Sequence, residues 1–425
     1  MRKTIQRQES NDDVDSNGNN EKINKLFVLA GGGTGGHIYP AIAIAHSLKR
    51  INSETDIVFI GGRGRLEATI IPEKGFKFYP ISVEGFPRKA TLKWIPVILK
   101  MFQGLFQSYK YLKRLKPDVV IGTGGYVSGP VLFAASLLRI PIVIQEQNAS
   151  PGLTNRILSK RVKAAYLALD SDDHPFPNNI KKITGNPIRL EITTFPRDHN
   201  TYNKYNLSPN RKTVFVMGGS QGAKVINDIM IRTCPLIVRS ILMQESHKRS
   251  PQVEKIDEMN TIPLQIVHQT GKTGTENVED AYSSHDIPHY VSPFFDQVEE
   301  IYSIADVMIC RAGGMTISEV TACGIPTIFI PLPAAVGNNQ VSNAYTVANA
   351  GAAVVLEQDN LQPEDVVAEL VRITTDEESY QNMKTASLNL GRPKASDTIA
   401  ESIYNIACSN DSIKNPQQSR VNNFI

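Results

Sequence analysis

The chain has 425 residues, which is enough for two or three domains of ordinary size. Its composition is that of a globular protein, with 41% hydrophobic residues and a net charge of +3 from 45 basic and 42 acidic residues. This nearly neutral balance disfavours a protein that coats nucleic acid, so we expect no nucleic-acid partner.

Both ends of the chain are polar. Residues 1–24 are rich in Asn, Asp and Gln and predict a disordered tail without the apolar core of a signal peptide. Residues 409–425 have a similar composition and predict a second polar tail. No apolar run between them approaches the ~20 residues that a bilayer-spanning helix needs, so we expect an intracellular protein.

Short apolar runs alternate with helical patterns between these tails. The alternation predicts the α/β class, with parallel sheets and crossover helices. A polar stretch near 187–211 separates a first domain, 25–187, from a second, 188–392, and the polar segment 244–260 predicts a surface elaboration. The clearest strands are 25–30, 56–60, 118–122 and 141–145 in the first half and 212–217, 264–269, 305–310 and 325–330 in the second.

Each half opens with a buried strand that runs into glycines and then a helix. The first turn is Gly31-Gly32-Gly33-Thr34-Gly35-Gly36-His37, with a helix expected from about Pro40. The second is Gly218-Gly219-Ser220-Gln221-Gly222-Ala223. Glycines permit close backbone approach, and a helix N-terminus offers free N–H groups and a charge of ~+0.5. Each turn therefore predicts a phosphate or diphosphate site, with an unliganded tight turn as the alternative.

The spacing Gly31-x-Gly33-x-x-Gly36 also fits the dinucleotide fingerprint. That fingerprint needs an acidic residue ~20 positions later, at the end of the second strand. Here the second strand runs into Gly61-Gly62-Arg63, which contains no acid. An NAD-linked oxidoreductase is therefore only the second hypothesis, and a non-catalytic sugar-binding protein is the third. We expect no cofactor.

A third glycine site, Arg311-Ala312-Gly313-Gly314-Met315-Thr316-Ile317-Ser318-Glu319, again joins a strand to a helix. Thr316 and Glu319 have the spacing of a capping box, so an ordinary helix start is one interpretation. The other is that Glu319 accepts hydrogen bonds from the ribose hydroxyls of a nucleotide.

Metal binding has little support. Asp170-Ser171-Asp172 has the D-x-D form of some metal sites, but it is a lone match in a polar loop. The four cysteines form no C-x-x-C pair, which argues against a zinc site and a disulfide scaffold. We therefore expect no metal.

Residues 85–117 contain eight basic residues and no acidic one. Aromatic residues are interleaved with them, including Trp94, the only tryptophan. Such a mixture favours contact with an anionic membrane surface. A core helix with a solvated basic face is the alternative.

Six motifs in order resemble glycosyltransferase family 28, over about residues 25–407. They are 32–37 with Pro40, 124–130, 145–148, 185–189, 218–222 and 311–319. The resemblance implies a GT-B fold, in which two Rossmann-like domains face a cleft and a final helix, about 393–408, crosses back to the first. It also implies a peripheral protein on the cytoplasmic face of the bacterial inner membrane.

The implied reaction is inverting transfer of GlcNAc from UDP-GlcNAc to the C4 hydroxyl of MurNAc in undecaprenyl-pyrophosphoryl-MurNAc-pentapeptide, which converts lipid I to lipid II. His37, Tyr126 and Glu146 are implied on the acceptor side. The residues implied in UDP-GlcNAc binding are Thr34, Gly35, Gly36, Asn148, Arg189, Ser220, Phe295, Gly314, Met315, Thr316, Ile317, Ser318, Glu319 and Gln340.

Such a transfer needs a general base for the incoming hydroxyl. His37 follows the first glycine turn, and imidazole titrates near neutral pH, so His37 is the first candidate. Its alternative role is a helix-start residue that bonds to backbone. Glu146 is the rival base, and its alternative role is a structural partner for Arg156 or for nearby backbone.

Overall fold

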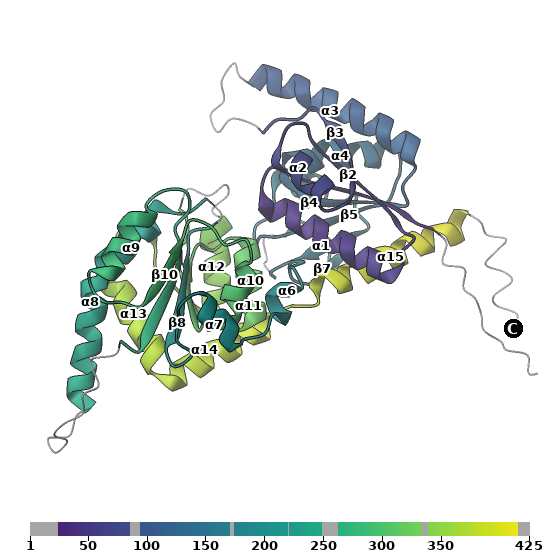
Figure 1. Cartoon of the computed structure of the whole chain (residues 1–425). Coiled ribbons are helices and arrows are strands. Elements are labelled where there is room, and N and C mark those ends of the chain that lie inside the picture. The colour runs from purple at the N-terminus through teal and green to yellow at the C-terminus, as the bar shows by residue number, and fades with distance from the viewer. Residues whose placement is uncertain are drawn as a thin grey trace, which may run out of the picture.

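The computed structural model describes residues 24–85, 94–170, 174–219, 221–248, 262–333 and 339–414. They form two lobes, each built on its own parallel sheet (Figure 1). The first sheet contains β1 (Leu26–Gly31), β2 (Asp56–Gly62), β3 (Lys77–Ile81), β4 (Val119–Gly124), β5 (Ile142–Glu146), β6 (Ala164–Leu167) and β7 (Lys181–Ile183). The second contains β8 (Lys212–Met217), β9 (Leu264–Gln269), β10 (His289–Ser292), β11 (Val307–Cys310), β12 (Thr327–Phe329) and β13 (Ala353–Val355). The predicted α/β class with two parallel sheets is confirmed.

Helices cover both faces of each sheet. The first lobe contains α1 (Gly35–Ile51), α2 (Leu66–Glu73), α3 (Trp94–Leu115), α4 (Gly125–Leu137) and α5 (Leu153–Leu158). The second contains α6 (Glu191–Thr194), α7 (His199–Lys204), α8 (Lys224–Lys248), α9 (Thr275–Ser283), α10 (Val298–Ile304), α11 (Gly314–Cys323), α12 (Asn339–Asn349), η2 (Gln358–Asn360), α13 (Pro363–Thr375) and α14 (Glu377–Leu390). Of the predicted elaboration 244–260, residues 244–248 belong to α8 and the rest lies outside the described residues.

The strand order reverses once in each sheet. The first sheet has the order β3-β2-β1-β4-β5-β6-β7, and the second has β10-β9-β8-β11-β12-β13. The reversal lies between β1 and β4 in one sheet and between β8 and β11 in the other. Open α/β sheets bind ligands outside the carboxyl ends of their strands at such a point. All three glycine turns of the sequence follow strands of these two pairs.

The central strands are buried on both faces, which explains their continuous apolar sequences. In β1, Phe27 and Leu29 join one apolar cluster, while Val28 and Ala30 join another on the opposite face of the sheet. All four side chains are fully buried. This alternation follows from the two-residue period of a strand.

The last helix, α15 (Ala395–Lys414), returns to the first lobe and packs on α1 (Figure 1). Ile399, Ile403 and Ala407 are fully buried in the same cluster as Phe27. The helix continues to Lys414, so it extends into the segment 409–425 that the sequence predicts to be a polar tail. A helix that is already nucleated lengthens at little cost, because each added residue gains one hydrogen bond.

The helix α1 begins at Gly35, before Pro40, where the sequence analysis expected its start. Thr34 has an extended backbone, with φ −144° and ψ 158°, and so ends the turn. The N–H groups of His37 and Ile38 donate to its carbonyl oxygen at 3.1 and 3.2 Å. The glycine turn therefore leads directly into a helix N-terminus.

Candidate active site

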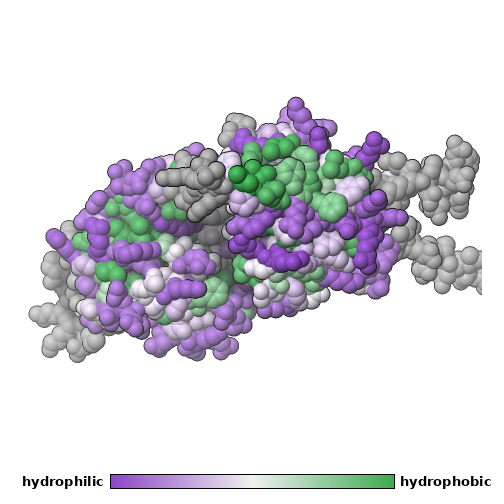
Figure 2. Space-filling view, turned by 90° about the horizontal axis from the view of Figure 1, so that it is seen from above, coloured by the Kyte–Doolittle hydropathy of each residue, from purple (hydrophilic) through white to green (hydrophobic). Residues whose placement is uncertain are grey.

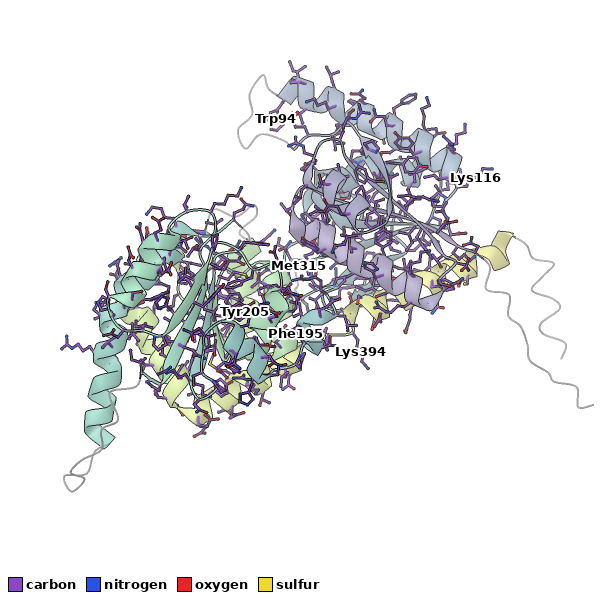
Figure 3. All side chains as sticks on the ribbon, viewed as in Figure 1. Trp94, Lys116, Phe195, Tyr205, Met315 and Lys394 are labelled. Carbon is purple, nitrogen blue, oxygen red and sulfur yellow. The ribbon has the colours of Figure 1, made fainter. Side chains whose placement is uncertain are left out.

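A cavity of about 920 Å³ lies between the two lobes. The wall from the first lobe is the side of α1, from its first turn to Arg50. Met315, in the first turn of α11 of the second lobe, lies where the two lobes face each other (Figure 3). Of the residues predicted to bind the donor, the cavity is lined by Thr34, Gly35, Gly36, Arg189, Phe295, Met315 and Glu319. The fold thus brings together predicted residues that are almost 300 positions apart in the sequence.

The second glycine turn lies at the carboxyl end of β8. Met217, just before the turn, lines the cavity. Gly222 has a φ of +76°, and a Cβ at this position would lie 2.1 Å from the carbonyl oxygen of Thr270. A side chain at residue 222 would therefore displace the turn from the neighbouring strand. Ser220, which the resemblance assigns to the donor, lies outside the described residues.

The helix α11 starts without a side-chain cap. Its N-cap is Gly313, and the first intrahelical bond runs from Ile317 N–H to Gly313 C=O at 2.9 Å. The capping-box interpretation of Thr316 and Glu319 is therefore wrong, because the helix begins earlier and Glu319 lies in its second turn. This N-terminus offers uncapped N–H groups, as an anion site requires.

The carboxylate of Glu319 faces the cavity and accepts a hydrogen bond from the hydroxyl of Tyr302 at 2.8 Å. Burial raises the pKa of Glu319, whereas the Tyr302 hydrogen bond and the charge of Arg189 lower it. A carboxylate is an acceptor-only group with room for several donors, so it can receive further hydroxyl groups from a ligand.

Arg189 contacts both lobes. Its guanidinium lies 3.5 Å from a carboxylate oxygen of Glu299 in α10 and 6.0 Å from the ring centroid of Tyr39 in α1. The cation–π contact and the ion pair hold this cation at the boundary of the cavity. Neither Tyr39 nor Glu299 belongs to a motif, so neither was predicted from the sequence.

Phe295 lines the second lobe's side of the cavity, and its side chain is buried. Its N–H donates to Oε1 of Gln269 at 3.1 Å. The ring packs edge-on against Phe215 and Tyr205 at centroid distances of 6.1 and 6.0 Å. This packing fixes the position of the main chain at Phe295, which the resemblance implies in UDP-GlcNAc binding.

Part of the cavity lining is basic. His46, Lys49 and Arg50 of α1 line it together with Lys74. Burial, with the charges of Arg50 and Lys74, lowers the pKa of His46. This basic group was not predicted from the sequence, although residues 46, 49 and 50 have the i, i+3, i+4 spacing of one helix face.

A second constellation surrounds His37, where β1 and β4 diverge. Its Nδ1 lies 3.0 Å from the carbonyl oxygen of Thr123 and 3.1 Å from Oε1 of Gln147. The carbonyl can only accept, so Nδ1 carries a hydrogen, and a neutral ring then has its lone pair on Nε2. His37 is partly exposed and does not line the 920 Å³ cavity.

Two glycines make this arrangement possible. Gly124 and Gly125 have φ values of +103° and +78°. A Cβ at Gly125 would lie 2.1 Å from the carbonyl oxygen of Gly32, and one at Gly124 would lie 2.6 Å from Nδ1 of His37. The 124–130 motif of the sequence therefore lets the start of α4 approach the first glycine turn and the imidazole.

Glu146, the rival base, is buried and fully hydrogen-bonded. One carboxylate oxygen accepts from the main-chain and side-chain amides of Asn148 at 3.1 and 3.3 Å. The other accepts from Gly152 N–H at 3.1 Å and from the side chain of Asn155 at 2.7 Å. Arg156 instead donates to the Pro151 carbonyl. This geometry favours the structural interpretation of Glu146, as an anchor for nearby backbone.

Tyr126 and Glu67 flank the first glycine turn. A Cβ at Gly33 would lie 2.8 Å from the ring of Tyr126, and burial raises the pKa of this tyrosine. Glu67 is fully buried and accepts from Gly33 N–H at 3.1 Å and from Gly62 N–H at 3.0 Å. Glu67 belongs to no motif of the sequence, and its carboxylate fixes the turn through these two hydrogen bonds.

The other predicted donor residues do not line the cavity. Asn148 accepts a side-chain bond from Asn343 at 3.2 Å, and Oε1 of Gln340 accepts from Leu332 N–H at 3.0 Å. Ser318 donates to the Gly314 carbonyl at 3.1 Å. The remaining three, all in the first turn of α11, are Gly314, Thr316 and Ile317. Asn148, Gly314 and Ser318 lie in the contact between the lobes, because they bond to Asn343 or Asn186 of the opposite lobe.

An apolar ridge with basic neighbours lies on the outer face of the first lobe. Along α3, Ile95, Leu99, Phe102 and Phe106 are 57%, 65%, 59% and 63% exposed. Figure 2 shows hydrophobic side chains gathered on this face, and Trp94 and Lys116 mark the two ends of the helix in Figure 3. Lys113, Lys116, Arg139, Arg161 and Lys163 line an adjoining groove of about 770 Å³.

Neither a metal cluster nor a membrane span is found in the described part of the chain. Its His, Cys, Asp and Glu side chains form no group of three or more that could hold a metal ion. None of its helices combines the length and apolarity that a membrane crossing requires. Asp170 of the D-x-D match pairs with Lys181 at 3.2 Å, and residues 171–173 are outside the described ranges.

Comparisons with known proteins agree on one family. The chain matches the glycosyltransferase family 28 N-terminal domain over residues 27–167 and the C-terminal domain over 213–399. It is 39% identical over 390 residues to the UDP-N-acetylglucosamine--N-acetylmuramyl-(pentapeptide) pyrophosphoryl-undecaprenol N-acetylglucosamine transferase of Halothermothrix orenii, covering 90% of this chain and 99% of that protein. A Bacillus cereus transferase of the same description is 35% identical over 379 residues, covering 88% and 97%. The crystal structure of Acinetobacter baumannii MurG has a TM-score of 0.68 at 29% identity, over 89% of this chain and 99% of that one.

Proposed function

The chain belongs to glycosyltransferase family 28 and transfers N-acetylglucosamine from UDP-GlcNAc to lipid I, making lipid II, and we propose how its two lobes share this reaction. The observation that carries the proposal is the cavity between the lobes. The first glycine turn, α11 and Glu319 all line it. Two helix N-termini and a carboxylate in one cavity suit a nucleoside diphosphate joined to a neutral sugar.

The second lobe holds the donor. The carboxylate of Glu319 accepts from the ribose hydroxyls, and the main chain at Phe295 lines the uracil pocket. The turn 218–222 and the N-terminus of α11 bind the diphosphate through main-chain N–H groups. Arg189, held by Glu299 and Tyr39, adds a positive charge from the boundary between the lobes.

The first lobe holds the acceptor and the base. Nε2 of His37 takes the proton from the C4 hydroxyl of MurNAc, and that oxygen attacks the anomeric carbon of GlcNAc. The bond from this carbon to UDP breaks, and UDP leaves with the electron pair. Because the oxygen attacks from the face opposite UDP, the anomeric centre is inverted. The two acceptors at Nδ1 of His37 stabilise the positive charge that the ring gains. Thr34, Gly35 and Gly36 approach the leaving diphosphate at the N-terminus of α1.

The membrane surface is the third partner in this proposal. Because lipid I is membrane-bound, its sugar is presented close to the bilayer. The exposed ridge on α3 and its basic neighbours belong to the lobe that holds the acceptor. We place the protein peripherally on the cytoplasmic face, with this ridge in the bilayer interface.

The reaction itself is tested by radiolabel transfer. Folded protein should move labelled GlcNAc from UDP-GlcNAc to a short-chain lipid I analogue and release UDP. A folded preparation that binds UDP-GlcNAc but transfers no label to this acceptor would contradict the proposed function.

Replacing Glu319 with Ala should weaken UDP binding by a factor of ~10 to 150, because lost hydrogen bonds to a charged group cost ~1.5–3 kcal/mol. Isothermal titration calorimetry measures this directly. Glu357→Ala is a matched control, since Glu357 also accepts a tyrosine hydroxyl, that of Tyr345 at 2.8 Å, but does not line the cavity. Equal affinities for UDP in the two variants would count against the ribose contact.

Tyr302→Phe should move the pH dependence of UDP binding to higher pH. The Tyr302 hydrogen bond lowers the pKa of Glu319, so its loss raises that pKa further above the usual range for Glu. The protonated carboxyl accepts ribose hydroxyls less well, so affinity falls as the pH drops through this pKa. Arg189 and Glu299 also act on Glu319 and are unchanged in the variant. Kd measured across pH should show the shifted midpoint, and coinciding profiles would contradict the prediction.

A further inference from the structure

A chain of buried side-chain amides connects His37 to the second lobe. Gln147 contacts His37, Gln145 contacts Gln147, and Asn186 contacts Gln145. Asn186 in turn donates to the Gly314 carbonyl at 2.9 Å and to the Ser318 hydroxyl at 3.0 Å, both in α11. The three amide side chains are at most 4% exposed. A continuous hydrogen-bonded path thus runs from the candidate base to the helix of the donor site.

The direction of every hydrogen bond in this path is determined by main-chain carbonyls. The Asn186 nitrogen faces the carbonyls of Gln147 and Gly314, at 3.2 and 2.9 Å, so it must donate and Oδ1 must accept. Gln145 therefore presents its nitrogen to Asn186, at 2.7 Å, and its oxygen to Gln147. Turning any one amide around would set two acceptors against each other, at a cost that burial makes large.

The same rule fixes the proton on His37. Nε2 of Gln147 donates to Gln145 and, at 2.6 Å, to the Thr123 carbonyl, so Oε1 of Gln147 is left to accept. Nδ1 of His37, 3.1 Å from that oxygen, must therefore donate. The Thr123 carbonyl also faces Nδ1 and imposes the same direction. The requirements from α11 and from β4 agree on one tautomer, with the hydrogen on Nδ1.

We propose that Gln147, Gln145 and Asn186 are positioning residues, and that this amide relay holds His37 in the tautomer whose Nε2 can accept a proton. Because the relay ends on α11, it couples the contact between the two lobes to the tautomer of His37. Gly314 makes that contact close, since a Cβ there would lie 2.3 Å from the Gln147 carbonyl oxygen. The inference rests on the proposed role of His37 as the base.

The tautomer is measured directly by nitrogen NMR of the full chain containing isotope-labelled histidine, at a slightly alkaline pH where imidazole is neutral. The chain has eight histidines, so the His37 signal is assigned by its loss in His37→Gln. We expect the proton of His37 on Nδ1. A proton on Nε2 in the wild-type protein would overturn the relay, and this result needs no variant to fold.

Gln147→Leu tests the link next to the imidazole. It should lower kcat for transfer by ~10- to 100-fold, the loss seen when partners that orient metal-binding imidazoles are removed. The KM for UDP-GlcNAc should stay close to that of the wild type. The share of His37 that carries its proton on Nδ1 should fall below that of the wild type, because the Thr123 carbonyl alone is then left to accept that proton. Orientation of the ring, rather than donor binding, is what the variant disturbs.

Asn343→Leu is the matched control, because Asn343 is another fully buried amide between the lobes. It bonds to the Ala149 N–H at 2.8 Å and to the Ala312 carbonyl at 3.3 Å, and does not touch the relay. Its His37 tautomer should match the wild type. If both variants lower kcat alike while the tautomer stays on Nδ1, the loss reflects a looser contact between the lobes, and the relay is overturned. Full transfer activity in His37→Gln would instead show that His37 is not the general base. The tautomer measurement does not depend on that role.

Discussion

Replacing His37 with Ala should lower kcat for GlcNAc transfer by ~10²–10⁴, the usual contribution of a general base. The Kd for UDP should change little, because His37 does not line the cavity that carries Glu319 and Phe295. Its imidazole instead bonds to the Thr123 carbonyl and to Gln147 in the first lobe. Steady-state transfer and UDP calorimetry on the same preparation separate the two effects.

Glu146→Gln is the control for this assignment. All four hydrogen bonds to Glu146 come from N–H donors, so an amide NH₂ in its place would face donors in any orientation. We expect a loss of ~1–3 kcal/mol in the free energy of unfolding, measured by chemical denaturation, with a smaller effect on kcat of the folded enzyme. If Glu146→Gln loses turnover by the larger factor while His37→Ala is mild, the two roles must be exchanged.

The central strands could be predicted from the sequence because both of their faces are buried. The expected strands 212–217 and 264–269 coincide with β8 and β9, whose residues are nearly all buried. The shorter outer strands were missed. In β3 the residues are mostly partly exposed, and β13 has only three residues, so neither gives a continuous apolar run. Strand pairing, rather than local pattern, defines these edges.

The candidate site could likewise be predicted only where its residues are neighbours in the sequence. The first glycine turn and segment 311–319 are local motifs, and five of the donor residues that the resemblance implied within them line the cavity: Thr34, Gly35, Gly36, Met315 and Glu319. Contacts between distant segments carry no such signal. Glu67 meets Gly33 from 34 positions away, and Gln147 meets His37 from 110. Their roles depend on how β1, β2, β4 and β5 lie side by side in the sheet, which a single sequence does not reveal.

The ridge on α3 has the composition of an interfacial anchor. Its buried side, with Val97, Gly104 and Leu112, packs on the first lobe, while Leu99, Phe102 and Phe106 are more than half exposed on the other side. Lysine side chains flank the ridge, and Nζ of Lys110 lies 5.6 Å from the ring centroid of Phe106. Apolar side chains inside a basic border bind an anionic bilayer by insertion and by charge together.

Reversing the charges of Lys110, Lys113 and Lys116 to Glu should therefore abolish binding to anionic vesicles. At ~1 kcal/mol for each charge near the surface, three attractions are lost and three repulsions gained, a change of ~6 kcal/mol or ~10⁴ in the partition coefficient. Wild-type binding should also weaken with salt, because screening acts within ~8 Å at physiological ionic strength. Vesicle sedimentation measures both effects.

The matched control changes the same net charge on the second lobe, with Arg232, Arg239 and Arg372 replaced by Glu. These three are exposed on α8 and α13, away from the ridge and from the cavity. The control should keep most of the vesicle binding, and both triple variants should keep the wild-type Kd for UDP. Transfer to a water-soluble, short-chain acceptor should also survive in the α3 variant, while transfer to lipid I in vesicles fails. Equal sedimentation of the two variants would mean that net charge, and not this ridge, brings the protein to the bilayer.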